Sequence, residues 1–308
     1  MTTQENTMPS PIHNLQNYTS IQEAYKSVFF NVAEEPLYRM STDATTGKRV
    51  FIKVPQKAIT RADTSAYLGS VGEHFKTLQP LDQLKTFEPL LTSGYFELKQ
   101  GLALQGGKKI VIQVGLKNSM IDVTPNDPVH RLLSIVQGLD GSLAIATYDT
   151  NIRVVCLNTL KMSLTQANES GRILKIRHTQ SAQTRLSNVS DLLKNVVTNY
   201  AEDVARYRTM ASTKVSSANL KAYFSMVLNT DSPRTLEKLT ALHDQGRGAN
   251  QHTRGTVWGA YNAVTEYLDH ERGRNQDSGI TSSWFGPSAQ VRNRAYEAAI
   301  DAEYTVLA

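Results

Sequence analysis

The 308-residue sequence predicts an α+β protein, with a β-rich antiparallel meander and a packed helix in the first half and a helical second half. Two observations favour this fold class. Before Cys156, short extended runs alternate with turn residues such as Gly47, Gly106 and Gly107. After Cys156, apolar residues recur three and four positions apart, which is the spacing of amphipathic helices.

The first half is expected to open with a flexible segment, residues 1–20, which is rich in Thr, Gln, Asn and Pro. Gly47 marks a turn between the first two strands. Extended runs are expected at 36–43, 48–55, 65–72 and 74–80. A helix is expected at 80–94, with a bend or break near Pro89. Further strands are expected within 95–116 and 130–156, with turns at Gly106–Gly107, Asp140–Gly141 and Asp149–Asn151.

The second half shows helical spacing in most of its segments. Residues 171–179 are the exception, because Ile173 and Ile176 are interleaved with charges as in a short strand. Helices are expected at 157–168, 181–211, 216–228, 232–245, 255–273 and 288–307. These patterns predict a flexible N-terminus at 1–20, a β-rich core domain at 21–180, and a helical region at 181–308 packed on or following that core.

Composition narrows the functional classes. The net charge of +5 and the pI of about 9.1 favour an anionic partner only weakly, and a slightly basic soluble protein is the alternative. One cysteine excludes an internal disulfide framework and fits a reducing compartment. Residues 1–20 lack the apolar stretch of a secretory signal, and no run is long enough to span a membrane. We therefore expect a cytoplasmic protein without a membrane partner.

Motifs of the familiar enzyme classes are missing from the sequence. It contains no phosphate-binding loop, no paired metal-binding histidines and no G-x-S-x-G elbow. Asp269, His270 and Glu271 are adjacent on a predicted helix, where neighbouring side chains point in different directions. We expect no cofactor and no metal, and an enzyme is the less favoured interpretation.

Cys156 lies in the apolar run "NIRVVCLNTL", which covers residues 151–160. A reactive thiol needs a base and a positive setting, and His178 or His270 could supply the base. Free cysteines are nevertheless among the most buried residues, so we expect Cys156 to be a chemically quiet part of the core together with Val154, Val155 and Leu160. The stripe around Trp258 is likewise expected to face the core.

Basic residues gather in the middle of the chain. Residues 151–230 hold 11 Lys and Arg against 4 Asp and Glu, a balance of +7 that exceeds the +5 of the whole chain. Lys175 and Arg177 would share one face of a strand and Arg172 the other. We expect Arg153 to project towards an anion, with Asn158 and Thr159 near a helix start. The predicted nucleic-acid-binding residues are Lys108, Lys109, Arg153, Asn158, Thr159, Arg172, Lys175, Arg177, His178 and Arg185. Solvated surface charge is the alternative.

Four segments in combination resemble the phage/plasmid-like proteins of the domain-of-unknown-function 932 family. They are "RVVCLNTL" from Arg153, "IRHT" from Ile176, "GTVWGAYNAVTEYLDH" from Gly255, and Val71-Gly72 with Phe75. The resemblance covers about residues 40–300, and it lacks the Trp-His-Gly opening of longer members. It implies a mobile-element protein, since members occur near replication and recombination functions. It carries no settled activity.

The order of strands and helices is also similar to that of phage single-strand annealing proteins, which form rings or filaments and bind single strands along a basic groove. This likeness implies a single-stranded DNA partner and homo-oligomers larger than a dimer. The expected function is single-stranded DNA binding and annealing, or an accessory role in recombination. An interaction protein that acts on a host or defence factor, and an enzyme without a familiar motif that uses Cys156 or His178, remain alternatives.

Overall fold

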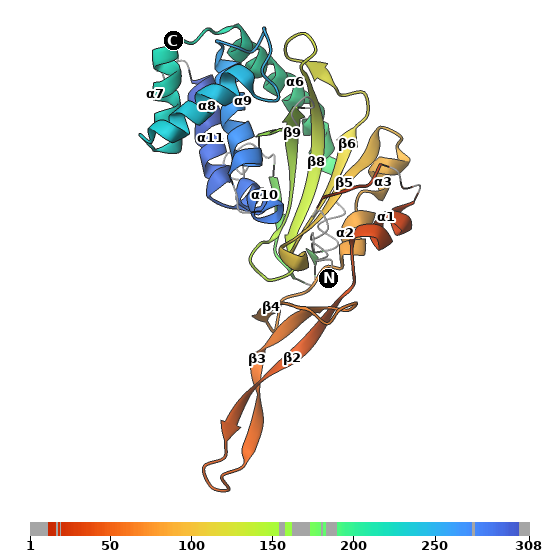
Figure 1. Ribbon diagram of the computed structural model, residues 1–308. Helices are drawn as coiled ribbons and strands as arrows, with labels where there is room; N and C mark the ends of the chain where they lie inside the picture. Colours follow the sequence, from red (N-terminus) through yellow and green to blue (C-terminus); the bar gives the residue numbers. More distant parts are fainter. Residues whose placement is uncertain are drawn as a thin grey trace, which may run out of the picture. The chain divides into compact units, whose positions relative to one another are not determined.

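The computed structural model describes residues 12–16, 18, 20–153, 158–161, 173–179, 181–182, 190–272 and 275–301. Strands dominate the first half and helices the second (Figure 1), so the α+β class is confirmed. None of the described helices is long and apolar enough to cross a membrane.

The described strands form two sheets. The eight-stranded sheet has the order β1-β5-β6-β8-β9-β10, with β11 beside β9 and β7 beside β8, and the second sheet has the order β2-β3-β4. The strands of the larger sheet are β1 (Ile12–Asn14), β5 (Phe96–Leu104), β6 (Lys109–Leu116), β7 (Ile121–Asp122), β8 (Pro128–Gly138), β9 (Ile145–Arg153), β10 (Asn158–Lys161) and β11 (Ile173–Ile176). Those of the smaller sheet are β2 (Val32–Thr42), β3 (Arg49–Arg61) and β4 (Tyr67–Gly72).

The helices follow from recognisable start signals. Ser20, Ser216, Thr256 and Asn275 each accept a backbone N–H with the side chain at a helix start, which is the preferred capping chemistry. The helices are α1 (Ile21–Val28), α2 (Pro80–Lys85), α3 (Glu88–Thr92), α6 (Ser190–Ser212), α7 (Ser217–Leu228), α8 (Pro233–Gln245), α9 (Val257–Glu266), α10 (Gln276–Phe285) and α11 (Pro287–Ile300). A π-helical turn, η3 (Tyr267–Glu271), continues α9, and a 3₁₀ turn, η1 (Gln105–Gly107), joins β5 to β6.

The chain divides into two compact units. The described residues of the first come from 1–114, 134–147 and 174–190, and those of the second from 115–133, 148–173 and 191–308. The core of the second unit is aromatic, because Tyr207, Tyr223, Trp258 and Tyr261 are fully buried there. The prediction that the stripe around Trp258 faces the core is confirmed. A separate domain at 21–180 stays a prediction.

Several expected elements differ in the structure. The turn expected at Asp149–Asn151 lies within strand β9, and residues 12–14 of the N-terminal segment expected to be flexible form β1, which pairs with β5. Residues 74–79 form no strand. The helix expected at 80–94 is two short helices, α2 and α3, with Pro89 in the first turn of the second. The helix expected at 157–168 is wrong for the four residues of β10, because Asn158 and Thr159 pair with Arg153 and Ile152 of β9.

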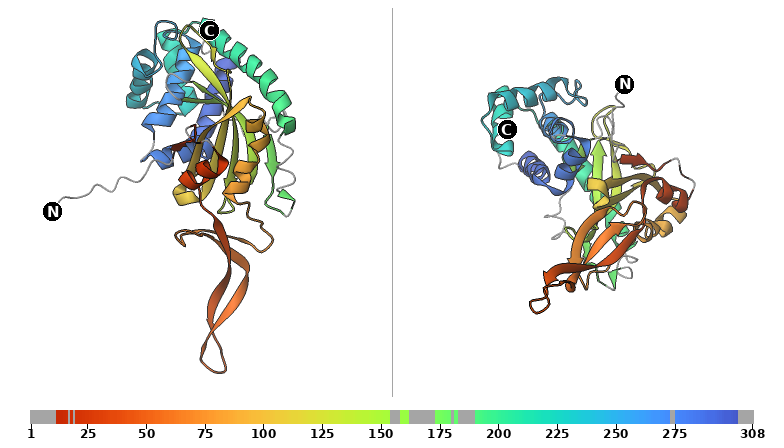
Figure 2. Two further views of the ribbon diagram at one scale, coloured as in Figure 1. Left: turned by 90° about the vertical axis from the view of Figure 1, so that its right-hand side faces the viewer. Right: turned by 60° about the horizontal axis from the view of Figure 1, so that its bottom comes forward.

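The long β2–β3 hairpin, seen from two further directions in Figure 2, belongs to the first unit. Its register shifts between Pro36, which pairs with Lys57, and Tyr38, which pairs with Lys53. Three residues of β3 therefore oppose one residue of β2, and this bulge divides the hairpin into a part next to β4 and a distal part. We call the distal part, residues 38–53, the arm.

Candidate nucleic-acid interface

Arg153 does not project towards an anion, and that prediction is wrong. Its side chain is 1% exposed and forms a bidentate ion pair with Asp127, through Nε at 2.5 Å and Nη2 at 2.8 Å. Nη2 also donates to the carbonyl of Gly248 at 2.8 Å, and the indole Nε1 of Trp258 donates to Asp127 at 2.8 Å. The guanidinium is thus part of the packed interior of the second unit and cannot contact a phosphate in this arrangement.

A second buried ion pair lies in the same unit. Arg131 Nη1 donates to Asp203 Oδ2 at 3.0 Å and to Asn151 Oδ1 at 3.0 Å, and both charged side chains are 1% exposed. Asn151 donates to the same carboxylate and to the hydroxyl of Tyr207. Burial raises the pKa of Tyr207 well above its usual range, so the phenol stays protonated. Asn151 and Arg153 are two residues apart on β9, so one strand face serves both ion pairs.

Lys109 is also unsuited to the predicted role. Its side chain is buried, and its Nζ donates to Gln105 Oε1 at 2.7 Å and to Asp140 Oδ2 at 3.4 Å. Burial acts to raise the pKa of Asp140, but hydrogen bonds from Ser142 and then the nearby Lys109 ammonium hold it below its usual range. The ammonium therefore has a carboxylate partner within the first unit.

His178 is buried rather than exposed, so its predicted contact with phosphate is wrong. Its ring stacks on Phe75 at 4.2 Å between centroids, and its two nitrogens lie 3.2 Å from the carbonyl oxygens of Lys76 and Leu143. Burial lowers the pKa of His178, although the two carbonyl oxygens act to raise it. The side chain joins three segments of the first unit and is not placed to act as a general base.

The pKa of His178 leads to a prediction for stability. The unfolded chain binds a proton near pH 6.5, whereas the folded chain resists it, so the free energy of unfolding should fall as the pH drops below about 6.5. His178→Gln should cost about 1 kcal/mol at pH 7 and should flatten this pH dependence. Urea unfolding between pH 7 and pH 5 measures both effects. Parallel pH profiles for the parent and the variant would contradict the prediction.

The structure describes the side chains of only some of the remaining predicted residues. Arg177 is exposed and Lys108 is partly exposed, so both are available for an anion. Asn158 and Thr159 belong to β10, and Lys175 belongs to β11, but their side chains are not among those described. Arg172, Arg185 and Cys156 lie outside the described residues.

The arm carries a second group of exposed cations. Arg39, Lys48, Arg49 and Lys53 are exposed, and Asp43 is the only carboxylate between residues 38 and 53, so the arm has a net charge of +3. Lys53 lies 3.5 Å from Glu73, with both side chains more than half exposed. Arg39, Lys48 and Arg49 form no ion pair with any residue in the described ranges. The sequence contains this charge, but only the structure shows that Arg39, Lys48 and Arg49 have no carboxylate partner in the described ranges.

Large apolar side chains are exposed on the same arm. Tyr38, Met40, Phe51 and Ile52 are 53%, 59%, 72% and 40% exposed. Tyr38, Met40 and Phe51 lie on one face of the hairpin, and exposed apolar patches on a protein surface often mark interaction sites. The turn that presents it is well ordered by hydrogen bonds, because the Asp43 carboxylate accepts the N–H groups of Thr45 and Thr46. These bonds lower the pKa of Asp43.

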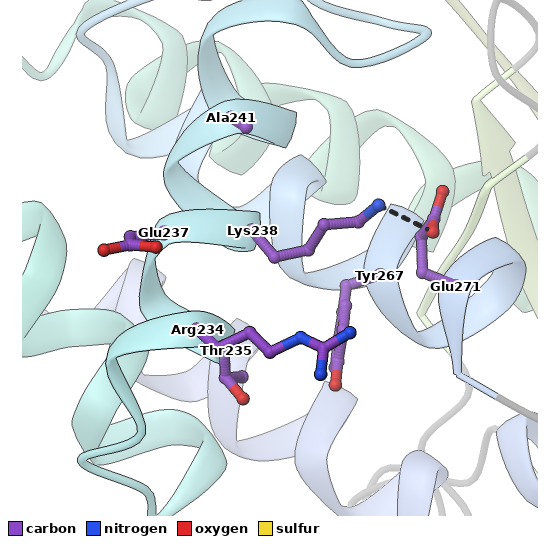
Figure 3. Close-up of a pocket in the computed structure, with 7 residues that line it drawn as sticks. All are labelled: Arg234, Thr235, Glu237, Lys238, Ala241, Tyr267 and Glu271. Atoms are coloured by element: carbon purple, nitrogen blue, oxygen red, sulfur yellow. Dashed lines mark ion pairs between the residues drawn. The ribbon is translucent and has the colours of Figure 1, made fainter.

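A surface pocket of about 520 Å³ lies in the second unit, between α8 and η3 (Figure 3). Lys238 on α8 forms an ion pair with Glu271 on η3 at 2.9 Å. The lining residues are Arg234, Thr235, Glu237, Lys238, Ala241, Tyr267 and Glu271. The lining contains two cations and two carboxylates, so the pocket has no net charge and does not favour an anionic ligand. No group of three or more metal-ligating side chains occurs in the described part of the chain.

Comparison with known proteins yields one family. The family described as a domain of unknown function (DUF932) matches residues 67–296. No curated protein and no solved structure matches the chain.

Proposed function

We propose that this chain, which belongs to the DUF932 family, binds single-stranded DNA through the arm of the β2–β3 hairpin. One observation carries the proposal: cationic and aromatic side chains occupy the same exposed strands, with a single carboxylate among them. Proteins that bind single strands without sequence preference combine positive charge along the backbone with aromatic rings for the bases. A role in annealing or recombination for a phage or other mobile element extends this proposal.

The charge of the arm differs in kind from that of the rest of the hairpin. Next to β4, Lys57 is paired with Glu34 at 2.5 Å and Arg61 with Asp63 at 2.7 Å. In the arm, Lys48 and Arg49 are exposed at the turn and lack such partners in the described ranges. Phosphate contacts by such side chains release counterions, which makes binding favourable and dependent on salt.

A titration with single-stranded and double-stranded DNA at several salt concentrations tests the proposal. The triple variant Lys48→Ala, Arg49→Ala, Lys53→Ala should bind single strands more weakly. The slope of log affinity against log salt should fall by about 2, because each lost phosphate contact removes about 0.7. The matched control changes three exposed cations of the second unit, Lys214, Lys221 and Arg234, to Ala and should keep the parent's slope.

Several outcomes of this titration would count against the proposal. A parent protein that binds no single strand would refute it. Equal slopes for the triple variant and the parent would show that the arm is not the site, and Lys108, Arg172, Lys175, Arg177 and Arg185 would be the next candidates. Annealing would also need several linked copies, and particle size measured in the same titration shows whether oligomers larger than a dimer form.

A further inference from the structure

We infer that one face of the arm is a stacking platform for unpaired bases, formed by Tyr38 and Phe51 and flanked by Lys53 and Arg49. The inference rests on the proposed function. It adds that the protein recognises the bases of the strand as well as its phosphates. It also selects one of the two faces of the hairpin.

The strand register places these side chains on one face. Tyr38 pairs with Lys53, Met40 with Phe51, and Thr42 with Arg49. Paired residues of antiparallel strands point to the same side, and so do residues two apart along a strand. Tyr38 and Phe51 are diagonal neighbours, which are about 7–8 Å apart in a regular sheet. Two rings at this spacing, with a cation beside each, can hold adjacent bases and neutralise the phosphates that join them.

The high exposure of the apolar side chains on this face needs an explanation. Phe51 is 72% exposed and Met40, its partner, is 59% exposed, so the pair places a large apolar area in water. Strand propensity does not require these residues, because Thr and charged residues occupy neighbouring exposed positions of the same hairpin. An aromatic ring that covers a base by stacking removes this apolar area from water, and stacking of this kind tolerates any base.

Charge decides between a nucleic acid and a second copy of the chain as the occupant. An arm from a second copy would bring the same +3 charge to the interface, and like charges placed together disfavour association. A single strand brings one negative charge for each base, which complements Arg49 and Lys53. The Lys53 pair with Glu73 is 3.5 Å long and more than half exposed, so a phosphate can replace this carboxylate. If the protein bound only the phosphates, Tyr38 and Phe51 on this face would contribute nothing to binding.

The opposite face of the arm provides a matched control. Arg39 pairs with Ile52, and Ser41 pairs with Val50. This face has an exposed cation and an exposed aliphatic residue, Ile52, but it has no aromatic ring. Ile52→Ala therefore removes a comparable apolar side chain from the same strands without touching the platform.

The experiment compares two single strands of equal length, an oligodeoxythymidine and an abasic strand with the same phosphates. Phe51→Ala should weaken binding to oligodeoxythymidine about tenfold, the effect of losing one stacked base. It should leave the salt slope and the binding of the abasic strand unchanged. Phe51→Trp should restore binding of oligodeoxythymidine, and Ile52→Ala should behave like the parent. Circular dichroism checks that each variant is folded.

Each other result overturns the inference in a recognisable way. If the parent binds both strands equally and with a full salt slope, stacking is refuted while single-strand binding stands. If the parent binds neither strand, the proposed function fails as well. If Phe51→Ala changes the particle size without DNA and binds DNA like the parent, the face covers a second copy of the chain.

Discussion

Replacing Asp127 by alanine is expected to lower the free energy of unfolding by about 3–5 kcal/mol, the usual cost of leaving one partner of a buried ion pair alone. Asp127 is 0% exposed, and both of its oxygens accept hydrogen bonds from the Arg153 guanidinium. The variant would leave this cation buried opposite a methyl group. It would also deprive the Trp258 indole N–H of its acceptor.

Urea unfolding followed by tryptophan fluorescence measures this effect. Asp122→Ala is the matched control, because Asp122 is exposed and lies five residues earlier in the chain, and it should change the free energy of unfolding by less than about 0.5 kcal/mol. A loss of less than about 1 kcal/mol for Asp127→Ala would show that the Arg153 pair contributes little to folding, as a water-exposed pair would.

The misplacement of Arg153 has a physical cause. Its ion-pair partner Asp127 lies 26 residues away in the chain, and Trp258, whose ring packs against the guanidinium, lies 105 residues away, so no local pattern indicates them. The scarcity of carboxylates in residues 151–230 was correctly counted, but Asp127 is outside that window. A count of charge along the chain cannot show which charges meet in space. The buried Arg131 and Asp203, 72 residues apart, were missed for the same reason.

Local signals predicted the elements that depend on local chemistry. The helix expected at 232–245 forms as α8, which begins at Pro233 directly after Ser232, and the turn expected at Gly47 joins the two strands of the β2–β3 hairpin. Two helices were missed although their caps were visible in the sequence. Ser20 precedes α1 with Glu23 in its first turn, and Asn275 with Ser278 forms a capping box at α10. Both helices are short, so apolar periodicity had few residues in which to appear.

The arm illustrates a different limit. Its strands were expected at 36–43 and 48–55, and they form in register with the turn at Gly47. Alternation in "RVFIKV" is consistent with a buried face as well as with an exposed one. Whether Phe51 is covered depends on which segments pack against β3, and β4 pairs only with the region around residues 56–60. That pairing is a property of the tertiary structure, so the candidate interface could not be predicted from the strand pattern.

The Arg153 pair also leads to a second prediction, at a glycine that packs against it. A Cβ atom added to Gly248 would overlap Nη1 of Arg153 and lie 2.7 Å from its Cζ. The guanidinium cannot move aside easily, because Asp127 holds it through two hydrogen bonds and the Gly248 carbonyl accepts a third. Gly248→Ala should therefore destabilise the protein by about 1–3 kcal/mol or more, the range of overpacked interiors.

The opposite sign is expected for Gly279→Ala. Gly279 lies within α10, and the nearest atom to an added Cβ is the Arg272 carbonyl oxygen at an ordinary contact distance of 3.5 Å. Alanine in a helix is favoured over glycine by about 0.5–1 kcal/mol, because it restricts the unfolded chain, so this variant should be more stable than the parent. Urea unfolding of the two variants side by side measures the difference. If Gly248→Ala is as stable as the parent, Arg153 can rearrange around a methyl group, and the rigid ion pair on which the first prediction depends is refuted.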